Sequence, residues 1–256
     1  MRRIRMIVEY DGTGYSGWQR QLNAMSVQEK LEDALRKLTG EKKLTVTGAS
    51  RTDAGVHAFS QNVHFDTESR IPAEKFPYAL HAFLPEDIRV REAFRVRDDF
   101  HARFQAKRKQ YRYLFYNSPH ASALLRNMTA HVMYKLDENL MRKEAENMIG
   151  THDFAPFAAS GSEVKDTVRT IYSVSVERKG NIVEMLVEGN GFLYNMVRIL
   201  AGTLIGVGSG KLAPGAIKRA LESGSRLDLG VTAPACGLTL MRIDYDDAEK
   251  IEDIIG

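Results

Sequence analysis

A single carboxylate, Asp53, stands in the stretch GASRTDAGVHA at residues 48–58, two residues after Arg51 and two before Gly55. One explanation is a tight turn, because Asp hydrogen-bonds its own backbone and Gly allows a positive φ. The other is chemistry, since a placed carboxylate acts as a nucleophile or a base. The stretch alone favours the turn, so the rest of the chain must decide.

Positive charge is concentrated between Phe100 and Leu136, a segment that contains no Asp or Glu. The net charge of the chain is +3, so the remainder is mildly acidic. Such a concentration indicates a surface that binds a polyanion, and a solvated basic loop is the alternative. Its bases are Arg103, Lys107, Arg108, Lys109, Arg112, Arg126 and Lys135.

Aromatic and basic residues alternate in KRKQYRYLFY, residues 107–116. On a strand, Tyr111, Tyr113 and Phe115 share one face and Arg112 lies on the other. Aromatic faces beside cations stack on unpaired bases, each stack contributing about 1–3 kcal/mol. We interpret Tyr113 and Phe115 as core residues and Tyr111, at the basic end, as a ligand contact.

A third candidate is Arg198, on the apolar helical stretch NGFLYNMVRILAG with no acid within four residues on either side. A guanidinium that enters a core needs a carboxylate from elsewhere, because an unpaired buried charge is very costly. Asp53 has no catalytic partner in its own segment, so it would suit as the carboxylate that pairs with Arg198. The alternative is that Arg198 extends to solvent along its aliphatic stem.

The stretches that suggest a cofactor or metal site do not match the motifs of such sites. GTLIGVGSGKL departs from a phosphate-binding loop, because Ile205 replaces the first Gly and Leu212 the hydroxyl residue. The seven histidines show no metal pattern, and Cys236 has the surroundings of a small packing residue. We therefore predict a protein without metal or organic cofactor.

The periodicity of the chain predicts two similar α+β halves with mostly antiparallel strands, and a duplication. The boundary is expected near residues 103–108. In the first half we expect strands at 4–10, 44–48, 57–65 and 88–95, and helices at 26–40 and 73–83. In the second we expect strands at 110–117, 170–177, 182–189 and 237–245, and helices at 137–149 and 192–208, with a shorter helix opened by Pro214.

The compartment follows from composition. Apolar residues make up 43% of the chain, but no apolar run is long enough to span a membrane, and the start MRRIRMIVEYDG is too polar for a signal peptide. A single cysteine excludes an internal disulfide. We expect a cytoplasmic protein without a membrane partner.

Four stretches resemble the successive signatures of the tRNA pseudouridine synthase A family: YDGTGYSGWQRQ, GASRTDAGVHA, KQYRYLFYN and GFLYNMVRILAGTLIGVG. The resemblance runs from about residue 4 to residue 245, and RTDAGVHA is its most specific part. It implies an isomerase that converts uridine to pseudouridine at positions 38 to 40 in the anticodon arm of tRNA, without metal or cofactor.

The family further implies a homodimer whose protomers have two ferredoxin-like α+β halves joined into one largely antiparallel sheet, with helices on one side and a catalytic cleft on the other. We assign an N-terminal domain to residues 1–105, a C-terminal domain to residues 106–246 and an acidic tail to residues 247–256.

Residue roles carry over by matching the motifs. Asp53 is the catalytic aspartate and Tyr111 the aromatic against the target uracil. Arg198 is the ion-pair partner of Asp53, and Arg51 is the mobile arginine that accompanies the flipped nucleotide. We expect Arg20, Lys107 and Lys109 to contact tRNA. The carboxylate could attack ribose carbon 1′, add to uracil carbon 6 or take a proton from ribose carbon 2′, and these three routes stay open.

Two other classes compete. A non-catalytic RNA-binding or RNA-chaperone protein explains the basic segment and Tyr111, but gives no reason for Asp53, which would repel phosphate. A metal-dependent RNA nuclease is the weaker alternative, and added chelator would abolish its activity.

Overall fold

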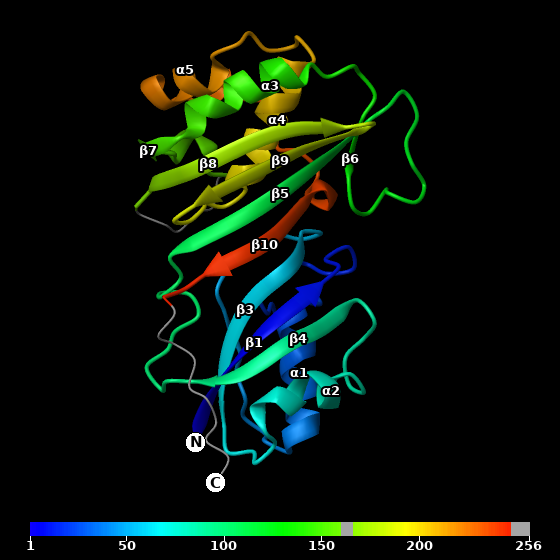
Figure 1. The fold of residues 1–256 in the computed structure, drawn as a ribbon, viewed down its shortest axis with the longest axis vertical. Coiled ribbons are helices and arrows are strands. Elements are labelled where there is room, and N and C mark those ends of the chain that lie inside the picture. Colours follow the sequence, from blue (N-terminus) through cyan, green and yellow to red (C-terminus); the bar gives the residue numbers. More distant parts are fainter. Residues whose placement is uncertain (160–165, 247–256) are drawn as a thin grey trace. The chain divides into compact units, whose positions relative to one another are not determined.

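The protein is described by a computed structural model that covers residues 1–159 and 166–246 (Figure 1). Two compact units make up the chain. The first contains Met1–Lys107 together with the chain from Leu240, and the second contains Arg108–Thr239. The last strand, β10 (Leu238–Asp244), is therefore divided between them. The domain limits expected from the sequence remain a prediction, and the acidic tail at 247–256 lies outside the described residues.

The first unit has the element order β-α-β-β-α-β of a ferredoxin-like fold. Strand β1 lies between β4 and β3, and β2 pairs with the other edge of β3, all antiparallel. The elements are β1 (Arg2–Tyr10), α1 (Val27–Thr39), β2 (Thr47–Gly48), β3 (His57–Thr67), the 3₁₀ turn η1 (Ala73–Lys75), α2 (Phe76–Leu80) and β4 (Ile88–Val96).

The second unit repeats the first five elements of this order as β5-α3-β8-β9-α4, with β6 and β7 inserted, and its strand neighbours β5-β9-β8 correspond to β1-β3-β2. The mixed α+β fold is therefore confirmed. Its elements are β5 (Arg108–Asn117), β6 (Ala130–Val132), α3 (Glu138–Ala145), η2 (Glu146–Met148), β7 (Gly150–Asp153), η3 (Ala155–Phe157), β8 (Val168–Lys179), β9 (Ile182–Gly189), α4 (Met196–Gly208), α5 (Ala216–Ser223), η4 (Arg226–Asp228) and η5 (Ala235–Gly237).

Helix ends follow the capping residues of the sequence. The hydroxyl of Ser26 accepts from the backbone N–H of Glu29 at 3.2 Å, and Gly40 ends α1 in the left-handed region with φ 76°. Asp137 caps α3 through the N–H groups of Asn139 and Leu140. These local signals begin both helices where expected, but α3 ends at Ala145 and η2 follows it, short of the expected end at residue 149.

Three other elements are also shorter than expected. The strand at 44–48 shrinks to β2 because side chains of α1 hold the backbone of Leu44 and Val46 instead of a neighbouring strand. The helix at 192–208 begins only at Met196, since Asn195 has φ 60°. The helix at 73–83 is reduced to η1 and α2, which contains Pro77.

Each unit has its own core beneath one face of its strands. Figure 1 shows α1 and α2 beside β1 and β4 in the first unit, and in the second α3 beside β8, with α4 and α5 packed against α3. Fully buried side chains include Ile4, Met6, Leu31, Leu35, Phe65 and Phe76 in the first unit and Tyr113, Phe115, Met141, Phe154, Met185 and Leu200 in the second.

Candidate active site

Asp53 lies on the loop between β2 and β3, and the backbone on both sides of it is fixed. The N–H of Trp18 donates to the carbonyl of Thr52 at 3.1 Å, and the N–H of Gly55 donates to the carbonyl of Tyr15 at 3.2 Å. Gly55 has φ 77°, so the turn chemistry of the sequence is present. The side chain of Asp53 is half-buried and that of Arg51 is exposed.

Two motifs of the first unit, YDGTGYSGWQRQ and GASRTDAGVHA, pack closely against each other through small residues. Gly17 has φ 92°, and a Cβ at this position would come within 2.5 Å of the carbonyl oxygen of Thr52. The indole of Trp18 is buried and lies against Gly48, where a side chain would clash with the ring. Small residues are therefore required here for close approach of two backbone segments.

Side chains complete the support of this loop. The hydroxyls of Tyr10 and Thr52 are 2.7 Å apart. Gln61 of β3 brackets Ser50, accepting from its N–H at 3.2 Å and donating to its carbonyl at 2.6 Å. Asp53 thus projects from a backbone that is held before and after it, as preorganised catalysis requires.

His57 connects the same loop to the turn after β1. It is 1% exposed, and its Nδ1 accepts from the N–H of Gly12 at 3.0 Å and lies 3.1 Å from Oδ1 of Asp11. Burial raises the pKa of Asp11, but hydrogen bonds from the hydroxyl and the backbone N–H of Thr13 outweigh it, so this pKa lies below its usual range. Asp11 is therefore a structural anion of the turn.

Tyr111 lies on β5 of the second unit, opposite Val187 of β9. It is 6% exposed, and its ring meets Phe192 edge to face with centroids 5.1 Å apart. Tyr113 and Phe115 are fully buried, which confirms their interpretation as core residues.

Arg198 belongs to the first turn of α4 and is half-buried. Its Nε donates to the carbonyl of Ala233 at 2.8 Å and its Nη1 donates to Oδ1 of Asn195 at 2.7 Å. The carbonyl of Arg198 also accepts from the N–H of Ala233 at 3.0 Å. The guanidinium is thereby oriented by the segment that precedes β10 and by the residue that begins α4.

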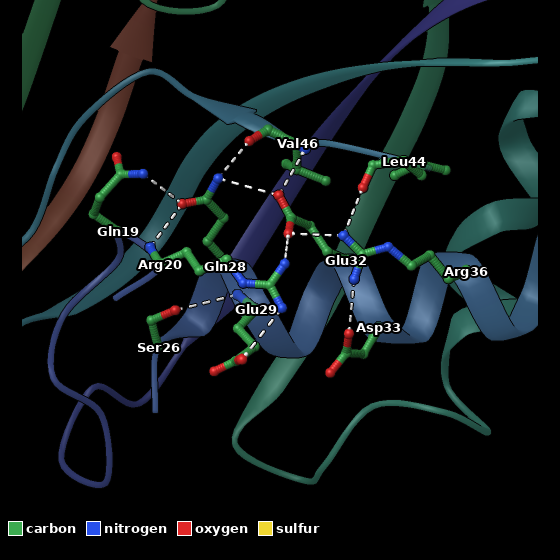
Figure 2. A network of polar contacts seen from close by, with 10 residues as sticks. All are labelled: Gln19, Arg20, Ser26, Gln28, Glu29, Glu32, Asp33, Arg36, Leu44 and Val46. Carbon is green, nitrogen blue, oxygen red and sulfur yellow. Dashed lines mark hydrogen bonds and ion pairs between the residues drawn. The ribbon is translucent and has the colours of Figure 1, made fainter. Parts of the chain in front are cut away.

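The three expected tRNA contacts have different surroundings. Arg20 donates to Glu29 at 3.2 Å and to the buried Glu32 at 2.9 Å (Figure 2). Lys107 is exposed and forms an ion pair of 3.2 Å with Asp246. Lys109 lies on β5 opposite Gly189.

Cys236 has the environment of a packing residue, as its neighbours in the sequence predict. Its thiol lies 3.3 Å from the carbonyl of Thr129, and burial raises its pKa, so it is no activated thiolate.

Within residues 1–159 and 166–246, no three His, Cys, Asp or Glu residues gather in a way that could hold a metal ion. None of the helices in this part of the chain is long and apolar enough to cross a membrane.

Comparison with known proteins decides the family. A profile described as tRNA pseudouridine synthase matches residues 6–105 and 145–246. The chain belongs to the tRNA pseudouridine synthase family. It is 52% identical over 245 residues to tRNA pseudouridine synthase A of Acetivibrio thermocellus and 45% identical over 246 residues to that of Bacillus subtilis. Each alignment covers 96% of this chain and 100% of the relative.

Membership in the pseudouridine synthase family confirms the enzyme class: the protein is an isomerase that converts uridine to pseudouridine in tRNA. The matched ranges include Asp53 in the first unit and Arg198 in the second. Tyr111, Lys107 and Lys109 lie between the two ranges.

Sequence reasoning missed the residues that hold the Asp53 loop and the segments beside it, above all Trp18, Gln28, Glu32 and His57. A signal was available for two of them. Gln28 and Glu32 are four residues apart on α1, on the same side as the apolar Leu31 and Leu35, and both are buried. Polar side chains on a buried helix face must have partners, which marks them as parts of a network.

Proposed function

We propose that this synthase acts on uridines 38 to 40 of the tRNA anticodon arm and that Asp53 is its catalytic carboxylate. The observation that carries the proposal is the half-buried Asp53 on a loop whose backbone is bonded on both sides, within the range that the family profile matches. A flexible surface turn would not need such support.

The reaction is an isomerisation, so its atoms balance without a co-reactant. The bond between N1 of uracil and ribose carbon 1′ breaks, and a bond from carbon 5 to carbon 1′ forms. The proton on carbon 5 leaves and N1 gains one. Attack at carbon 1′, addition to carbon 6 and removal of the carbon 2′ proton all need Asp53 as an ionised carboxylate.

The other residues take supporting roles in this proposal. Tyr111 packs against the flipped uracil, which offsets part of the few kcal/mol required when the base leaves its stack. Arg198 pairs with Asp53 and keeps it ionised. Arg51, exposed two residues before Asp53, accompanies the flipped nucleotide.

The homodimer and the cytoplasmic location expected from the family belong to the same proposal. Light scattering of the pure protein tests whether it is a homodimer.

The test is pseudouridine mapping of tRNA incubated with the pure protein. Transcripts with uridines at positions 38 to 40 and elsewhere are used, with no added cofactor and with a chelator in a parallel reaction. We expect pseudouridine at positions 38 to 40, unchanged by chelator. Modification only at other positions would refute the anticodon-arm assignment, and loss of product with chelator would refute metal-free catalysis.

A further inference from the structure

A buried polar network occupies the N-terminal half of α1, at some distance along the chain from Asp53. Its centre is Glu32, whose side chain is 2% exposed and accepts from Arg20, Arg36, Gln28 and the backbone N–H of Val46 (Figure 2). Four donors satisfy one buried carboxylate, which makes its ionised form tolerable in the interior.

The network holds the segment that leads to Asp53. Val46 precedes Asp53 by seven residues, and both of its backbone groups are engaged. Its N–H donates to Glu32 at 3.1 Å, and its carbonyl accepts from the side chain of Gln28 at 2.9 Å. These bonds fix the course of the chain into the Asp53 loop.

The same network also holds the loop that lies against Thr52. Oε1 of Gln28 accepts from the backbone N–H of Arg20 at 2.8 Å and from the side chain of Gln19 at 2.9 Å. The backbone N–H groups of Val27 and Gln28, unpaired at a helix start, donate to the carbonyls of Gly17 and Trp18. Trp18 then donates to Thr52, next to Asp53.

Arg20 lies at the exposed edge of this network. Its side chain is 40% exposed, but both terminal nitrogens are engaged: Nη1 lies 2.9 Å from Glu32 and Nη2 lies 3.2 Å from Glu29. A phosphate that recruited Arg20 would have to remove it from a buried carboxylate, which is strongly unfavourable.

We propose that Arg20 is a positioning residue that acts through Glu32 and Gln28 on the Asp53 loop, and that it does not bind tRNA. The inference rests on the proposed catalytic role of Asp53. It replaces our expectation that Arg20 contacts the RNA.

Arg36 provides a matched control, because it donates to the same oxygen of Glu32 at 3.2 Å but otherwise bonds to Asp33 and to the carbonyl of Leu44. Arg20→Gln and Arg36→Gln therefore both remove one charge and one bond to Glu32. Only the first removes a tether of the loop that carries Trp18.

Three quantities are measured for each variant: the melting temperature, the single-turnover rate at saturating tRNA, and the salt dependence of tRNA affinity. For Arg20→Gln we expect the rate to fall by at least about tenfold, since small misplacements of a catalytic group have effects of this size. Affinity and its salt slope should match the wild type. Arg36→Gln should lower the melting temperature to a similar extent with a rate within about twofold of the wild type.

Two results would overturn the proposal. A weaker and less salt-dependent affinity for Arg20→Gln, with an unchanged rate at saturation, would make Arg20 a phosphate contact. Equal rate losses for Arg20→Gln and Arg36→Gln would show that loss of either partner of Glu32 has the same effect and that Arg20 has no positioning role of its own. If Arg20→Gln does not fold, Arg20→Met is measured in its place, because it also removes the charge and the bond to Glu32, and the same two results would overturn the proposal.

Asp53→Asn in the same assay separates the two proposals. Activity that survives in Asp53→Asn removes the catalytic assignment, whereas the comparison of Arg20 with Arg36 concerns the network alone.

Discussion

Trp18 donates its backbone N–H to the carbonyl of Thr52 at 3.1 Å, one residue before the proposed catalytic carboxylate. This bond joins two motifs that are far apart in the sequence. The approach is possible because the residue before Trp18 is Gly17, with φ 92° and no room for a side chain.

Gly17→Ala should therefore damage the Asp53 loop. We expect folding stability to fall by about 1–3 kcal/mol because of the strained backbone, and a lower single-turnover rate with little change in tRNA affinity. Gly14→Ala is the control, because a Cβ there has no neighbour within 4 Å. Similar behaviour of the two variants in melts and rate measurements would show that the close approach at Thr52 is unimportant.

Tyr111 is expected to contribute both its ring and its hydroxyl. Tyr111→Phe should retain tRNA binding and lose rate if the hydroxyl takes part in proton transfer, while Tyr111→Leu should lose activity because the stacking face is gone. Tyr113→Phe is the control: its hydroxyl donates to the carbonyl of Pro234 at 2.7 Å, so its removal should cost about 1–2 kcal/mol of stability and no rate. Full activity of Tyr111→Leu would exclude Tyr111 from the site.

Reversal of Lys107 and Lys109 to Glu should weaken tRNA binding and flatten its dependence on salt, by about one unit of slope for each phosphate that the protein no longer neutralises. The ion pair of Lys107 with the exposed Asp246 does not prevent Lys107 from binding a phosphate, because ion pairs between exposed groups contribute little to stability. An unchanged salt slope would show that this part of the basic segment is only solvated.

His64 should make stability depend on pH. Burial, with help from Arg3 and His101, lowers the pKa of His64 from 6.5 to about 4, and its neutral Nδ1 accepts from the N–H of Ala102 at 3.1 Å. Between these two pKa values the unfolded chain binds more protons than the folded chain. The contribution of neutral His64 to folding stability is therefore complete above pH 6.5 and is lost as the pH falls toward 4.

The melting temperature should therefore fall between pH 7 and pH 5, and it should fall less steeply in His64→Gln. His120→Gln, at an exposed histidine, should keep the wild-type slope. Parallel slopes for the wild type and His64→Gln would contradict this origin of the acid sensitivity.

The sequence predicted what depends on neighbours along the chain. Ser26 and Gly40 fixed the limits of α1, and the period of two placed Tyr113 and Phe115 in the core. It could not predict that side chains of α1 would take over the backbone bonds of Val46 and shorten β2, because such bonds join residues 14 and 18 positions apart. For the same reason the sequence could not show that Arg20 bonds to Glu32, which is 12 residues away on a buried helix face.

Asp53 and Arg198 should behave as a coupled pair in folding stability. Arg198→Met should be the more destabilising single change, and Asp53→Asn a mild one. If the two side chains pair, the double variant should be more stable than the sum of the single losses predicts, by about 0.5–3 kcal/mol. Thermal melts of the three variants measure this coupling, and strictly additive losses would mean that the residues do not interact.

The catalytic role of Asp53 is tested most directly by release of tritium from tRNA labelled at carbon 5 of uridine, since this proton must leave when carbon 5 joins the ribose. The wild type and Asp53→Asn are compared under single-turnover conditions, after melts have shown that the variant is folded and binding assays that it retains tRNA. We predict release by the wild type and none by Asp53→Asn. Tritium release by pure, folded Asp53→Asn at a rate near that of the wild type would contradict the catalytic role of Asp53.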